Sequence, residues 1–250
     1  MSTASVIGLE EAGAGVVRVV MQDRNHKNGF SPELTYGLMQ AFASIGRDTR
    51  LRAVILTGYD HYFATGGTRE GLLAMHEGRS RFTDSTLYSL ALHCPIPVIA
   101  AMQGHAIGGG FVFGLFADFV ILSRESVYTT NFMKYGFTPG MGATGIVPRK
   151  LGAVLGGELL TAARSYRGAD LEKRGVAFPV VQRHEVHECA RQLAFDLAQK
   201  PRRALIELKS HLVADIREEL PRIVARELQM HEATFGDPEV GQRIQTLFDN

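Results

Sequence analysis

The chain has 250 residues, with 27 lysines and arginines against 26 aspartates and glutamates, and 45% of it is hydrophobic. This length and composition are those of a globular protein with a sizeable core, and they exclude a disordered chain. A formal net charge of +1 gives no electrostatic reason to bind nucleic acid or anionic lipid. Two cysteines and the lack of a long apolar run lead us to expect a cytoplasmic protein with no membrane span.

Strand and helix patterns alternate over the first 150 residues. Ser31 followed by Pro32 indicates the start of a helix, whose apolar face then runs as far as Ile45. Apolar runs predict strands at 16–21, 53–58, 98–102, 119–122 and, more briefly, 126–130. These alternating elements indicate an α/β fold.

Helical periodicity dominates from about residue 151 onward. It predicts helices over 151–163, 185–199, 202–212 and 215–235, with one short strand at 178–181. We therefore expect an α/β core followed by a helical C-terminal region.

Glycine is the one unusual residue type, with 27 in the chain. Gly108–Gly110 follow a predicted strand and precede a predicted helix, where free backbone N–H groups can stabilise negative charge on an oxygen. Gly66 and Gly67 form a second such turn. Two turns can direct two N–H groups at one point, as an oxyanion hole requires. For the first turn alone, close packing of a helix on a sheet is the alternative interpretation.

The order of these motifs resembles the crotonase (enoyl-CoA hydratase/isomerase) superfamily. The matching pieces are Phe63–Gly67, Gly104–Gly110, Asp118 and Pro139–Thr144. The resemblance covers nearly the whole chain. It implies a spiral of ββα units over residues 1–195 and a helical trimerisation region over residues 196–250.

The resemblance also implies a reactive centre that binds an acyl thioester. The thioester carbonyl oxygen would lie between the N–H groups of Gly67 and Gly109, the two oxyanion residues. Their neighbours Gly66 and Gly108, together with Lys134, are expected to contribute to substrate binding.

Two glutamates that hydratases of this superfamily use to handle water are absent here. Their positions hold Val112 and Phe132, which cannot transfer a proton and which we expect to line a dry substrate pocket. Addition of water is therefore not expected. A dry pocket with an oxyanion hole suits decarboxylation of an acid conjugated to a thioester, because loss of CO2 leaves a dienolate.

Two segments, 128–140 and 227–235, resemble the decarboxylase branch that works in polyketide β-branching. That branch implies conversion of 3-methylglutaconyl to 3-methylcrotonyl on the phosphopantetheine of an acyl carrier protein, with no other cofactor and no metal. It also implicates a histidine on the C-terminal helix, which here is His231, as the general acid.

The match to this branch has one gap. Some members carry a tyrosine and a lysine on the helix after the first oxyanion residue, where this chain has Gly71 and Met75. Positioning of the substrate carboxylate is then either taken over by another cation, for which the candidates are Arg69, His76 and Lys134, or absent. Without such a cation, catalysis would depend on the oxyanion hole, the dry pocket and His231.

Two other interpretations use the same motifs. An enoyl-thioester isomerase needs the same oxyanion hole and one acid–base group but loses no carbon. A non-catalytic family member acting as a binding or assembly protein would fit the empty hydratase positions. We expect an acyl carrier protein as partner, with Arg79 and Arg81 as candidate docking residues, and self-association as a homotrimer or a further-assembled hexamer.

Overall fold

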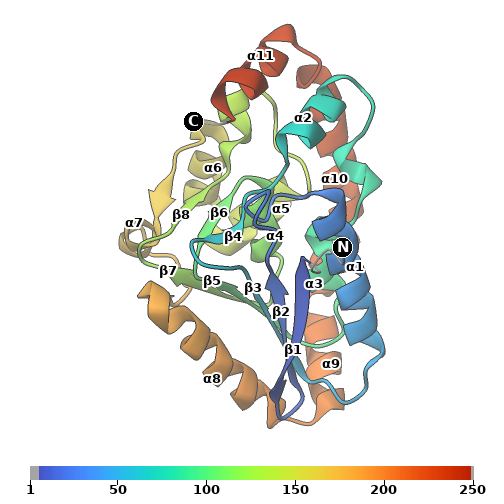
Figure 1. Cartoon of the computed structure of the whole chain (residues 1–250), viewed down its shortest axis with the longest axis vertical. Helices are drawn as coiled ribbons and strands as arrows, with labels where there is room; N and C mark the ends of the chain where they lie inside the picture. Colours follow the sequence, from blue (N-terminus) through green and yellow to red (C-terminus); the bar gives the residue numbers. More distant parts are fainter. Residues whose placement is uncertain (1–5, 249–250) are drawn as a thin grey trace.

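The computed structural model describes residues 6–248 and contains two β-sheets flanked by helices (Figure 1). One sheet has six strands in the order β1-β2-β3-β5-β7-β10, and the other has four in the order β4-β6-β8-β9. The strands are β1 (Ile7–Gly13), β2 (Val16–Met21), β3 (Ala53–Thr57), β4 (Tyr62–Ala64), β5 (Val98–Met102), β6 (His105–Ile107), β7 (Phe119–Ser123), β8 (Val127–Thr129), β9 (Tyr166–Arg167) and β10 (Val180–Val181).

Helices surround both sheets. The α-helices are α1 (Pro32–Arg47), α2 (Arg69–His76), α3 (Leu90–His93), α4 (Gly109–Leu115), α5 (Ala143–Leu151), α6 (Ala153–Ala162), α7 (Gly168–Lys173), α8 (Val186–Ala198), α9 (Arg202–Leu212), α10 (Ala214–Thr234) and α11 (Pro238–Leu247). Short 3-10 helices occur at η1 (Phe82–Asp84), η2 (Leu87–Ser89), η3 (Asn131–Tyr135) and η4 (Arg183–Glu185).

The chain winds through the two sheets in repeated ββα turns. In each turn the first strand joins the six-stranded sheet, the second joins the four-stranded sheet, and a helix follows; β3, β4 and α2 form one turn, and β5, β6 and α4 form the next. Strands β2, β3, β5, β7 and β10 run parallel to one another. This arrangement confirms the predicted α/β fold built from ββα units.

The first long helix forms for the reasons read from its sequence. The Ser31 hydroxyl accepts a hydrogen bond from the Leu34 N–H at 3.1 Å and so caps α1, and Pro32 occupies the first turn. The buried face of α1 consists of the predicted residues Leu34, Leu38, Ala41, Phe42 and Ile45.

Helix α8 covers one face of the six-stranded sheet (Figure 1). Its buried positions are small, Ala190 and Ala194 among them, which lets the helix lie close to Ile55 and Ile99 of the sheet. Because the other face of the same strands packs into the main core, β3 and β5 are buried on both sides. This explains why their sequences are continuously apolar.

Several short elements were not predicted. Strands β4, β6 and β9 have only two or three residues, too few for a periodic pattern. The predicted helix over 151–163 corresponds to α6, but α5 precedes it unpredicted, and Gly152 separates the two with φ at +82°. Residue 195, the predicted boundary of the core, falls inside α8.

Candidate active site

The two glycine turns meet because the strands before them are neighbours. Strands β4 and β6 pair in parallel, with Ala64 opposite Ala106, so the segments that follow them leave the sheet side by side. A Cβ atom on Gly66 would lie 2.9 Å from the Gly109 amide nitrogen, and the φ of Gly66 is +79°. Only glycine fits this position, since a side chain would push the two turns apart.

The N–H groups of Gly67 and Gly109 are both available to a ligand. Within residues 6–248, neither group donates a hydrogen bond to another part of the chain. Gly109 begins α4, so its N–H points out from the helix N-terminus. Both glycines line the same cavity, of about 780 Å³. The pair has the arrangement that an oxyanion hole requires.

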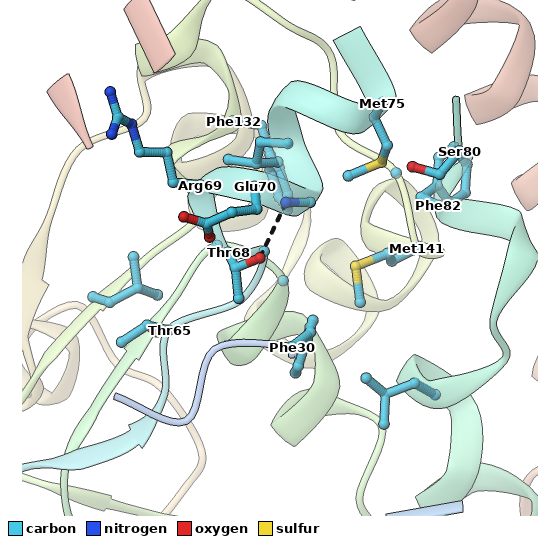
Figure 2. Close-up of a pocket in the computed structure, with 18 of the residues that line it drawn as sticks. Phe30, Thr65, Thr68, Arg69, Glu70, Met75, Ser80, Phe82, Phe132 and Met141 are labelled. Atoms are coloured by element: carbon cyan, nitrogen blue, oxygen red, sulfur yellow. Dashed lines mark hydrogen bonds between the residues drawn. The ribbon is translucent and has the colours of Figure 1, made fainter. Parts of the chain in front are cut away.

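The surface of this main cavity is more apolar than polar, although charged side chains also line it. Figure 2 shows Phe30, Met75, Phe82 and Met141 arranged around the open space. A wall of this kind lowers the local dielectric and strengthens the attraction between the N–H groups and a developing oxyanion.

Met141 is a wall residue that the sequence analysis missed. It lies in the 139–144 turn with φ at +64°, an uncommon conformation for a residue with a side chain. Its Sδ atom is 2.9 Å from the point where a Cβ on Gly109 would lie, so it packs directly against the second oxyanion residue. The positive φ of a non-glycine residue leaves no clear signal in a single sequence.

His231 reaches the main cavity from α10. Its side chain is buried, with 8% of the residue exposed, and burial lowers the pKa of the imidazole to about 4. The ring stacks on Phe235 with centroids 4.2 Å apart and meets the edge of Phe82 at 5.1 Å. The imidazole is therefore neutral at pH 7 in the empty site, and a nearby negative charge would favour its protonation.

Glu227 ties this helix to the turn that carries Met141. It lies one helical turn before His231, and its buried carboxylate accepts hydrogen bonds from the N–H groups of Gly142 and Thr144 at 2.6 and 2.7 Å. The Thr144 hydroxyl donates a third, at 2.6 Å. Burial raises the pKa of the Glu227 carboxyl. These bonds hold α10 and the start of α5 at a fixed distance.

The structure brings together most of the residues expected at the site. Five of them line the main cavity, namely Gly67, Gly108, Gly109, Phe132 and His231. Gly66 packs closely against the backbone of Gly109.

Two of the expected substrate-binding residues lie elsewhere. Val112 is fully buried within α4 and is not part of the cavity wall, and Lys134 is exposed on η3, also outside the wall. The reason for Val112 is that α4 turns its side chain into the core, three residues beyond Gly109.

The candidate cations also differ in position. Arg69 lines the main cavity, but its guanidinium points away from Met75 and Met141 (Figure 2). His76 is outside the wall, and its Nδ1 donates to the Phe235 carbonyl oxygen at 2.7 Å. Arg81, which the sequence suggested only for docking, does line the cavity. Its neighbour Phe82 touches the His231 ring.

Across residues 6–248, no group of three or more His, Cys, Asp or Glu side chains is arranged to hold a metal ion. No helix in that range has both the length and the apolar character needed to cross a bilayer.

Comparison with known proteins places the chain among relatives of stated activity. Residues 11–246 match the family model described as enoyl-CoA hydratase/isomerase. Bacillaene synthase decarboxylase PksI from Bacillus subtilis (strain 168) is 63% identical over 248 residues, which cover 99% of this chain and 100% of the relative.

Solved structures agree with this placement. One, described as part of a dehydratase/decarboxylase enzyme couple involved in polyketide β-branching, has a TM-score of 0.98 and 63% identity, over 98% of this chain and 100% of that one. The decarboxylase domain of CurF from Lyngbya majuscula has a TM-score of 0.93 and 45% identity, over 97% and 99% of the two chains. The chain therefore belongs to the enoyl-CoA hydratase/isomerase (crotonase) family, and within that family to the decarboxylases of polyketide β-branching.

Proposed function

We propose that this protein removes the terminal carboxylate of a 3-methylglutaconyl group carried on an acyl carrier protein, giving a 3-methylcrotonyl group and CO2. The protein is a decarboxylase and not a hydratase, as its 63% identity to PksI indicates. The observation that carries the specific reaction is that His231 and two free N–H groups face one mainly apolar cavity.

The first step is loss of CO2. The bond to the carboxylate carbon breaks, and its electron pair moves into the conjugated thioester to form a dienolate. The N–H groups of Gly67 and Gly109 stabilise the negative oxygen of that dienolate, and one donor of this kind contributes about 3 kcal/mol in enzymes with oxyanion holes.

The second step is protonation of carbon. His231 donates a proton from a ring nitrogen to the dienolate and returns to the neutral form that its buried environment favours. The substrate carboxylate, entering a cavity with this ring in its wall, supplies the negative charge that favours the protonated imidazole beforehand.

Arg81 holds the substrate carboxylate in this proposal. Its guanidinium forms an ion pair with Glu232 at 3.2 Å at the cavity wall, and η1, which follows it directly, touches His231 through Phe82. A guanidinium can bind a carboxylate through two parallel hydrogen bonds. Such a pair would orient the carboxylate that leaves as CO2.

The partner proposed for this site is a carrier protein with its phosphopantetheine arm, and no other cofactor is required. His26, Lys27 and Arg69 line the main cavity beside its apolar wall. The buried Asn28 side chain holds the loop of His26 and Lys27 by donating to the carbonyl oxygens of Met21 and Phe63 at 3.0 and 2.9 Å. The positive side chains of Lys27 and Arg69 suit the phosphate of the arm.

Two further features belong to the proposal. The protein acts as a homotrimer, and it acts in the cytoplasm. Its cysteines, Cys94 and Cys189, are both free thiols, which supports a reducing compartment.

Intact-mass spectrometry of a carrier protein loaded with 3-methylglutaconyl tests the reaction. We expect the wild type to remove the mass of CO2 and His231→Ala to do so roughly 10²- to 10⁴-fold more slowly, since it lacks the general acid. His211→Ala, on the exposed surface of α9, serves as the matched control and should retain the wild-type rate.

The same assay examines the carboxylate site. Arg81→Gln should raise the KM for the loaded carrier protein roughly tenfold, because it loses a charge-assisted pair. Arg47→Gln, at an exposed position of α1 outside the cavity wall, should leave the KM unchanged. An unchanged mass with a shifted double bond would instead identify an isomerase, and binding without any change would identify a non-catalytic protein.

A further inference from the structure

A second, smaller cavity meets the site at His231. This side cavity has a volume of about 220 Å³ and lies between the end of α2 and the end of α10. Its wall shares five residues with the main cavity, namely Met75, Ser80, Arg81, His231 and Phe235. The His231 ring therefore lies between the two cavities and lines both of them.

The proposed reaction consumes one proton in every turnover. The substrate enters as a carboxylate, CO2 leaves, and a new C–H bond forms, so His231 must take a proton from water each time. Burial keeps the imidazole neutral at pH 7 in the empty site. The proton therefore has to arrive after the substrate, when the acyl chain and the pantetheine arm fill the main cavity.

We propose that the side cavity is the path by which a proton from water reaches His231 while the substrate occupies the main cavity. This inference rests on the proposed function, because it assumes that His231 protonates the dienolate. It assigns a role to a cavity that extends beyond the main one, to Leu228 and Gly236.

The side cavity has the size and the polar groups to hold water. A water molecule occupies about 30 Å³ in the liquid, so several fit within the 220 Å³ available. Polar partners come from both walls: Ser80 and Arg81 on one, and Glu232 on the other. Buried waters usually need two to four such partners.

The ionisable groups around His231 set the field in which it takes up the proton. Its own helix supplies Glu227 and Glu232, and the segments packed against it supply His76, Arg81, Asp84, Tyr88 and Tyr135. Arg81 and Glu232 form an ion pair, and the His76 Nδ1 is occupied by the Phe235 carbonyl.

Filling the side cavity tests the proposal with residues that do not line the main one. Leu228 and Gly236 line the side cavity alone, and a Cβ on Gly236 would meet nothing within 4 Å. We therefore choose Leu228→Trp and Gly236→Phe. Gln229→Trp, at the next and exposed position of α10, introduces the same bulk without filling the cavity and is the matched control.

The expected result is a loss of kcat with an unchanged KM. Both filling variants should lose roughly tenfold in kcat at pH 8, with a smaller loss at pH 6 because protons are more abundant, and their solvent deuterium isotope effect on kcat should rise. The control should match the wild type in all three quantities. Wild-type kcat and isotope effect in both filling variants would overturn the proposal, as would an equal loss at every pH.

A second measurement does not depend on turnover. A carrier protein bearing saturated 3-methylglutaryl, which cannot form a dienolate, is used to fill the main cavity. Deuterium exchange at the ring carbon of His231 is then followed by mass spectrometry. The exchange should continue in the wild type and the control and slow in the filling variants; equal exchange in all of them contradicts the path. Absence of CO2 release by the wild type would contradict the proposed function separately.

Discussion

At the scale of single residues, burial determines the charge of the proposed general acid. His231 lies among the rings of Phe82, Phe137 and Phe235, and no charged partner holds a proton on it in the described part of the chain. At pH 7, an imidazole in such surroundings takes up a proton only when an anion enters. The residue is thus matched to a substrate that carries its own carboxylate.

The lowered pKa of His231 predicts a specific loss of stability in acid. Above pH 6.5 the ring is neutral in both the folded and unfolded states and contributes nothing. Below pH 6.5 His231 is protonated in the unfolded chain, whereas in the folded chain it becomes protonated only near pH 4. The free energy of unfolding should therefore fall by about 3 kcal/mol over that pH range because of this residue alone.

Urea unfolding of the wild type and of His231→Leu at several pH values measures this loss. The difference in unfolding free energy between the two proteins isolates His231, because the other histidines are present in both. As the pH falls from 6.5 to 4, the unfolding free energy of the variant should increase relative to that of the wild type. A difference that stays constant over this range would contradict the lowered pKa.

At the scale of elements, the site depends on contacts between segments that are distant in the sequence. The carboxylate of Glu227 on α10 caps the start of α5 through Gly142 and Thr144. The buried donors at the start of α5 have no alternative partner among the described residues. This single side chain positions both the helix of His231 and the turn of Met141.

Glu227→Ala should therefore lower the free energy of unfolding by roughly 3 kcal/mol or more, since buried donors lose their acceptor. Chemical denaturation measures the change. Glu218→Ala, at an exposed position of the same helix, should change stability by less than about 0.5 kcal/mol. Equal effects of the two substitutions would show that the cap adds nothing to stability.

At the scale of the whole molecule, α9 carries apolar side chains that are exposed to solvent in a single chain. Leu208 is 58% exposed and Leu212 is 69% exposed, and they lie four residues apart on one face of the helix. Neighbouring exposed leucines indicate an interaction surface more strongly than scattered ones do. The proposed homotrimer would cover them.

Light scattering after size-exclusion chromatography tests the trimer. The wild type should have three times the 27.4 kDa mass of one chain, and the double variant Leu208→Asp with Leu212→Asp should shift toward the mass of one chain, because charges oppose burial. Glu207→Gln on the same helix should leave the mass unchanged. A wild type of one-chain mass would refute the trimer.

The sequence by itself determined the motifs that depend on local chemistry. The capped start of α1 and the apolar strands β2, β3, β5 and β7 follow from residue type and spacing. The glycine turns could be found because Gly66 needs a backbone conformation that few other residues adopt. The ordered set of these turns also predicted the family, and segments 128–140 and 227–235 predicted the decarboxylase branch. The comparisons confirm both predictions.

Only the tertiary structure decided which side chains face the cavity. Val112 lies near Gly109 in sequence, but the helix turns it into the core; Met141 is distant in sequence yet packs against Gly109. Strands β4 and β6 are too short to leave a pattern, although their pairing brings the glycine turns together. Such placements depend on contacts across the spiral, and residue spacing along one segment carries no record of them.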